Sequence, residues 1–113
     1  MGVWTHINGN VRIDNLDQKE KIEKIIEKEF KNTLLSYNVI PYYHKECIRG
    51  YNIVIWADLD EFSNIDKFEK WFNQLTHASK LLIREGILQI EIPYIDCRLL
   101  IYGGDKNKTV YYK

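Results

Sequence analysis

Apolar and polar side chains alternate at the beginning of the chain, in the stretch "WTHINGNVRID" (residues 4–14). Successive side chains of a β-strand point to opposite faces, so this alternation predicts a strand with two different sides. One side is mostly apolar and is expected to face the core: Val3, Thr5, Ile7, Val11 and Ile13. The other side carries rings, amides and a guanidinium: Trp4, His6, Asn8, Asn10 and Arg12. We interpret this second side as a recognition face, because a plain solvent-facing side rarely holds a tryptophan.

Two longer segments have apolar residues spaced three and four positions apart, which is the pattern of an amphipathic helix. The first covers residues 14–37, with Asp17 as its expected N-cap. The second covers residues 63–86, with Ser63 as its expected N-cap and Gly86 just past its end. Charges of both signs alternate along the first segment, which predicts a solvated helix surface rather than a site for a polyelectrolyte.

The remaining segments predict four further strands, over residues 51–58, 87–92, 97–102 and 109–113. Residues 38–50 are expected to be irregular, because Pro41 cannot lie inside a regular element. The resulting order β, α, β, α, β, β, β predicts a single α+β domain over residues 1–113. We expect a two-layer sandwich with two helices on one face of a mostly antiparallel sheet, and a ferredoxin-like topology is the nearest common form.

Composition limits the classes of partner. The 113 residues contain 16 basic and 16 acidic side chains, so no overall charge attracts the chain to long nucleic acid or to a membrane. No apolar run reaches the length of a membrane span, and no secretion signal precedes the first strand, so we expect a cytoplasmic protein. Cys47 and Cys97 have no metal-binding spacing and are expected to be small apolar fillers in a reducing compartment.

The candidate site follows from placing the predicted strands in one sheet. The face away from the helices is expected to carry the recognition residues Trp4, His6, Arg12, Trp56, Arg98 and Tyr102, together with the apolar Val54 and Leu100. A second group of rings, Tyr42, Tyr43 and His44, lies beside Pro41. A ligand, a sister subunit or the segment 42–47 could each cover such an apolar face.

The sequence supports three other functions less well than a binding face: metal binding, nucleophilic catalysis and RNA binding. His6, His44 and His77 have no spacing that would gather a metal with Cys47 or Cys97, so we expect neither a metal nor a cofactor. His44 and Cys47 are the one local pair for nucleophilic catalysis, which leaves a small hydrolytic or metal-assisted enzyme using His6 or His44 as an alternative. A further alternative is a single-stranded RNA-binding module, because ferredoxin-like sheets stack bases on aromatic side chains.

The stretch "GVWTHINGNVRID", together with "DEFSN" before a helix containing "WF", resembles a group of small phage-encoded proteins of unassigned function. These proteins begin with a Trp-Thr-His-Ile/Val-x-Gly pattern. The resemblance implies a phage or prophage origin and action in the cytoplasm of the host cell. We therefore expect a non-catalytic, homo-oligomeric binding protein that inhibits a host defence factor or sequesters a nucleotide-like ligand.

Overall fold

The computed structural model describes residues 4–59, 65–77, 80–93, 96–103 and 106–112. Their elements, in chain order, are β1 (Thr5–Ile13), α1 (Lys19–Phe30), β2 (Ser36–His44), β3 (Cys47–Leu59), α2 (Ile65–Thr76), β4 (Ile83–Ile92), β5 (Asp96–Gly103) and β6 (Lys106–Tyr112). The chain is an α+β domain, as its sequence pattern predicts.

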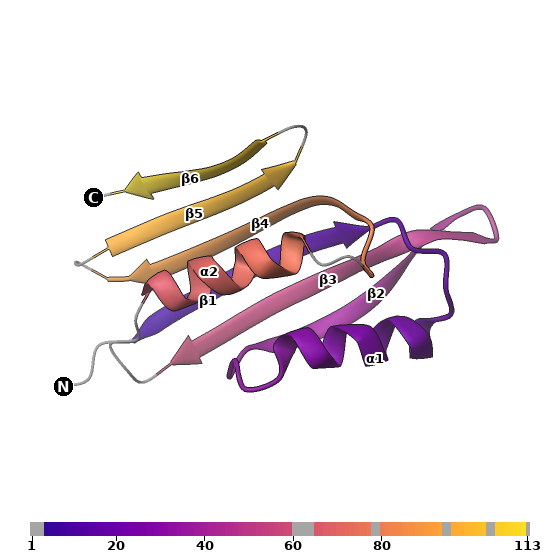
Figure 1. The fold of residues 1–113 in the computed structure, drawn as a ribbon, viewed down its shortest axis with the longest axis horizontal. Helices are drawn as coiled ribbons and strands as arrows, with labels where there is room; N and C mark the ends of the chain where they lie inside the picture. The colour runs from indigo at the N-terminus through magenta and orange to yellow at the C-terminus, as the bar shows by residue number, and fades with distance from the viewer. Residues whose placement is uncertain (1–3, 60–64, 78–79, 94–95, 104–105, 113) are drawn as a thin grey trace.

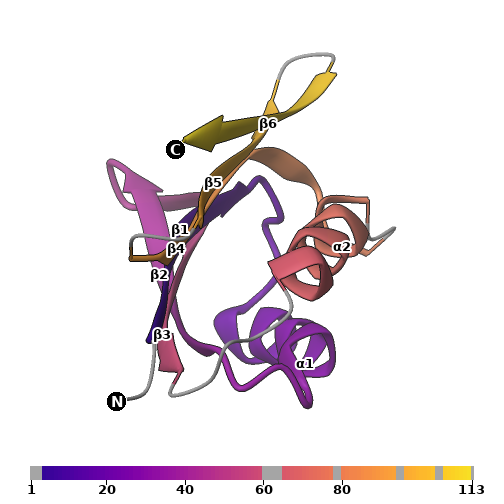
Figure 2. The same ribbon diagram turned by 90° about the vertical axis from the view of Figure 1, so that its left-hand side faces the viewer.

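The described strands form one antiparallel sheet with the order β2-β3-β1-β4-β5-β6 (Figure 1). β1 lies inside the sheet, between β3 and β4. Both helices lie on the same side of the sheet, so its other side has no helix over it (Figure 2). The order of the whole sheet is not that of a four-stranded ferredoxin-like domain, because β5 and β6 continue the sheet beyond β4.

The prediction of an irregular segment over residues 38–50 was wrong. These residues belong to β2 and to the first part of β3, which form a hairpin with His44 opposite Cys47. Pro41 is tolerated because β2 is the outermost strand on its side of the sheet. An edge strand has one side without a strand partner, where the missing N–H of proline removes no ladder hydrogen bond.

The helices are shorter than their apolar patterns suggested. α1 ends at Phe30, after which Asn32 and Leu34 have positive φ and the Thr33 hydroxyl donates a hydrogen bond to the Phe30 carbonyl oxygen. Its N-cap is Gln18, one residue after the expected Asp17. α2 ends at Thr76, and Gly86 lies inside β4, while Ser63 falls outside the described residues. No helix among the described residues is long and apolar enough to cross a membrane.

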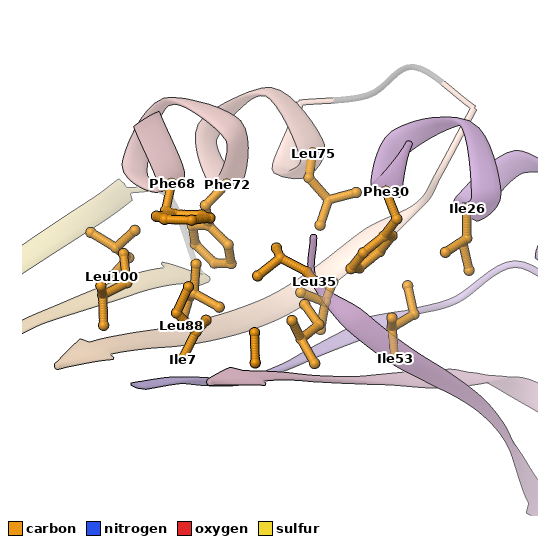
Figure 3. Close-up of a cluster of buried hydrophobic side chains, with 14 of the residues drawn as sticks. Ile7, Ile26, Phe30, Leu35, Ile53, Phe68, Phe72, Leu75, Leu88 and Leu100 are labelled. Carbon is orange, nitrogen blue, oxygen red and sulfur yellow. The ribbon is translucent and has the colours of Figure 1, made fainter. Parts of the chain in front are cut away.

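The core lies between the helix layer and the sheet (Figure 3). Each helix turns its apolar stripe inward, and each central strand contributes every second residue. The labelled side chains include Ile26 and Phe30 of α1, Phe68, Phe72 and Leu75 of α2, and Ile7, Ile53, Leu88 and Leu100 of the sheet. The two helices are also joined directly, because Trp71 Nε1 donates a hydrogen bond to the Glu29 carbonyl oxygen at 2.7 Å.

Gly50 is required where β3 passes the end of β1. Its φ is 149°, which side chains with a Cβ rarely adopt, and a Cβ there would overlap the carbonyl oxygen of Ile13. Gly103 in β5 is the matched control, because a Cβ there would meet Glu85 Cβ at 3.5 Å, an ordinary contact.

We therefore expect Gly50→Ala to lower the free energy of unfolding by about 1–3 kcal/mol, the typical cost of a strained backbone position. Gly103→Ala should change it by less than about 1 kcal/mol. Urea denaturation followed by circular dichroism measures both values. Equal stabilities for the two variants would show that the backbone at Gly50 is not constrained as described.

Candidate binding face on the helix-free side of the sheet

Four polar residues of β1, which are His6, Asn8, Asn10 and Arg12, form a row on one side of the sheet. The pairing of β1 with β3 and β4 shows which residues lie next to each of them. Residues that lie opposite each other in paired strands share a face. His6 lies between Asp58 and Glu91, Asn8 between Trp56 and Gln89, Asn10 between Val54 and Ile87, and Arg12 between Asn52 and Glu85. We call this side, with Ile40 and Tyr42 of β2 and Leu99 and Ile101 of β5, the open face. The predicted sidedness of "WTHINGNVRID" is therefore confirmed from Thr5 to Ile13.

The open face also carries large apolar side chains that are accessible. Trp56 is 45% exposed, Ile87 is 42% exposed and Ile40 is 44% exposed. Val54 is half-buried beside them. Exposed apolar side chains that gather on one face indicate a binding site or an interface.

One end of the open face holds a histidine between carboxylates. His6 Nδ1 lies 2.6 Å from Asp58 Oδ1, and Glu91 is the neighbour of His6 on the β4 side. A carboxylate at this distance fixes the orientation of the imidazole ring. Nucleophilic catalysis also needs a hydroxyl or thiol beside the base, and the two strand neighbours of His6 are both carboxylates.

The other end of the open face holds Arg12, about 20 Å from His6 at ~3.3 Å per residue. The Arg12 guanidinium carbon lies 4.3 Å from the centre of the Tyr42 ring, a cation–π contact. Its Nε is buried and has no hydrogen-bond partner among the described residues. A shallow hollow of about 320 Å³ lies beside it, with Asn10, Asn52 and Glu85 in its lining.

The second predicted ring group lies at the end of the β2–β3 hairpin. Tyr43 and His44 are exposed, and Cys47 opposite His44 is exposed too, so the expectation that Cys47 is a buried filler was wrong. The hairpin continues the sheet past its other strands (Figure 1), and its end bends toward the helix-free side (Figure 2). Trp4 is exposed just before β1.

Two predicted site residues, Arg98 and Tyr102, lie on the opposite side of the sheet. Arg98 Nη1 lies 2.5 Å from Asp66 Oδ1 and 2.9 Å from Glu69 Oε2, both on α2. The Tyr102 ring meets the His77 ring edge-on at 5.8 Å between centres. Leu100, which lies between them in β5, is buried in the core rather than on the open face.

The error came from the register of β5. Leu99, Leu100 and Ile101 form an unbroken apolar run, so alternation could not show which of them faces the helices. A shift of one residue moves every side chain of a strand to the other face. The structure pairs Leu88 with Leu100, which places Leu99 and Ile101 on the open face instead. Ile40 was missed because β2 was not expected.

The described residues contain no group of three histidine, cysteine or acidic side chains arranged to hold a metal ion. Comparison of the chain with protein-family models, curated proteins and solved structures gives no significant match. The functional interpretation therefore depends on the geometry of the molecule.

Arg98 is expected to stabilise the fold rather than to bind a partner. Arg98→Ala should lower the free energy of unfolding by about 1–2 kcal/mol, because Glu69 would stay half-buried without this cation. The control is Arg84→Ala, which removes an exposed ion pair with Asp14 and should cost less than about 0.5 kcal/mol. Denaturant unfolding measures both, and an Arg98→Ala variant as stable as Arg84→Ala would contradict this assignment.

Proposed function

We propose that this chain is a non-catalytic binding protein that uses the open face to bind a protein surface. A small phage protein that inhibits a host defence factor would work in this way. The observation that carries the proposal is the exposure of three large apolar side chains, Trp56, Ile87 and Ile40, on the open face. Large aromatic side chains in such positions supply most of the binding energy of protein interfaces.

The charges of the open face favour a protein over a nucleic acid. On β1, β3 and β4 the face carries three carboxylates, Asp58, Glu85 and Glu91, together with the guanidinium of Arg12. Carboxylates at these three positions would repel a phosphate backbone. Base stacking also loses one of the expected rings, because Tyr102 lies on the other side of the sheet. Both points weigh against the single-stranded RNA-binding alternative.

When no other protein is present, a second copy of the chain can cover the open face, because the charges at the two ends of this face are complementary. Two-fold symmetry is the commonest symmetry of a dimer, and it makes the same patch meet itself. If the axis lies between the two sheets and perpendicular to the strands, the strands of the two copies run in opposite directions. Arg12 at one end would then approach Asp58 and Glu91 at the other end of the second copy. The apolar residues in the middle would meet each other, and sheets pack face to face in this way at about 10 Å.

We expect the protein to have at least twice the mass of one chain in light scattering at micromolar concentration. Trp56→Ala should weaken this assembly by about 2 kcal/mol, or roughly thirtyfold in dissociation constant. The control is Leu82→Ala, which removes an exposed apolar side chain outside the open face and should leave the mass unchanged. A single-chain mass for the unmodified protein, or equal effects of the two substitutions, would contradict self-association through the open face.

A nucleotide-like ligand is the second candidate, because the hollow beside Arg12 offers a buried guanidinium Nε and the amides of Asn10 and Asn52. Its volume is at the lower end of the range for small-molecule sites. Calorimetric titration with nucleoside monophosphates tests this candidate. Heat of binding that disappears in Arg12→Gln would support it, and no heat with the unmodified protein would remove it.

A further inference from the structure

The helix side of the molecule carries a groove lined by two rows of lysines. On α1 and just after it, Lys21, Lys24, Lys28 and Lys31 follow one another at intervals of three or four residues. Residues at this spacing lie on one side of a helix, about 5–6 Å apart. Lys21, Lys24 and Lys28 line one hollow between the helices, and Lys31 lines a second hollow.

The facing row belongs to α2 and the residues after it. Lys67, Lys70, Gln74 and Lys80 line the same two hollows, and Gln74 lies in both of them. The hollows have volumes of about 440 and 510 Å³ and together follow the groove between the helices. α1 and α2 lie side by side over the sheet (Figures 1 and 2).

Few acidic groups neutralise this groove. Lys21 donates a hydrogen bond to Asp17, which lowers the pKa of that carboxyl. Among the described residues, the other lysines of the groove form no ion pair within 4.0 Å. Asp66 also lines it, but its carboxylate already contacts Arg98. Glu29 remains between the rows.

The acidic side chains of α1 face the other way. Glu20, Glu23 and Glu27 line a hollow beside Tyr37 and Val39 of β2, and Lys24 lies at the boundary because it lines this hollow as well as the groove. The pKa of the Tyr37 hydroxyl is raised, mainly by burial and also by the negative charges of Glu27 and Glu23. The effect of these two charges is consistent with a group of carboxylates on that flank. Charges that alternate in sign along the sequence therefore gather mainly by sign in space, with three glutamates on one flank of α1 and three lysines, Lys21, Lys28 and Lys31, on the other.

We infer that the lysine groove binds the phosphate backbone of double-stranded nucleic acid without reading its sequence. Lysine ammoniums act on phosphates as point charges, and two parallel rows suit a chain of phosphates. The aromatic residues that line the groove do not offer a stacking surface. Phe68 is buried, and Trp71 is half-buried with its Nε1 hydrogen-bonded to the Glu29 carbonyl oxygen. A duplex needs no such surface, because its bases stay stacked on each other. This inference does not depend on the open face.

Fluorescence anisotropy with a labelled DNA duplex tests the inference. Electrostatic binding to about four phosphates predicts a loss of about a hundredfold in affinity between about 50 and 200 mM salt. The double variant Lys28→Gln/Lys70→Gln should bind more weakly, and the slope of log affinity against log salt should fall in magnitude by about two. The matched control Lys45→Gln/Arg49→Gln removes the same charge from the β2–β3 hairpin and should bind as the parent does.

Circular dichroism confirms that both double variants are folded before the comparison. Equal losses in the two variants would overturn the inference, because they would show an effect of net charge alone. It would also be overturned if the single strand bound more tightly than the duplex, if polyglutamate competed as well as the duplex, or if anionic phosphatidylserine vesicles bound while the duplex did not. Trp56→Ala should bind the duplex as the parent does, which separates this test from that of the open face.

Discussion

The position of β1 between β3 and β4 is the constraint on which both surfaces of the molecule depend. Its antiparallel pairing with both neighbours fixes which of its side chains face the helices. Ile7, Val11 and Ile13 enter the core, so His6, Asn10 and Arg12 must face the other way. The strands approach closely here: at Gly9 of β1, a Cβ would lie 2.7 Å from the carbonyl oxygen of Ile87 in β4.

The two helices give the molecule two different surfaces, the open face of the sheet and the groove between the helices. They cover one side of the sheet and leave the other side without a helix (Figure 2). That open face carries exposed apolar side chains of β2, β3 and β4 beside the polar row of β1. The outer groove of the helices is lined with lysines. The equal numbers of acidic and basic residues therefore conceal a strong separation of charge, since composition reports only the sum.

Sequence pattern could predict the α+β class, both helices and the two sides of β1, because these depend on local periodicity. The prediction from sequence failed where the pattern of apolar residues does not show which side chains of a strand face the helices. The apolar run around Leu100 fits either register of β5, and only its packing against α2, with the ion pairs of Arg98, selects one. It also failed at Pro41, because a proline is compatible with a strand once that strand lies at an edge, and edges are a property of the assembled sheet. The lysine groove was missed for a related reason: the two rows meet only when α1 and α2 pack side by side.

The central claim is that the open face is the surface that other proteins cover. Acrylamide quenching of Trp56 tests it most directly, in a variant with Trp4→Phe and Trp71→Phe so that Trp56 is the remaining tryptophan. The protein concentration is raised from about 0.1 to about 100 μM, which brackets a dimer of micromolar affinity. Burial of the open face predicts a severalfold fall in the quenching constant over this range. A quenching constant that stays the same while light scattering shows assembly would mean that the chains associate through another surface.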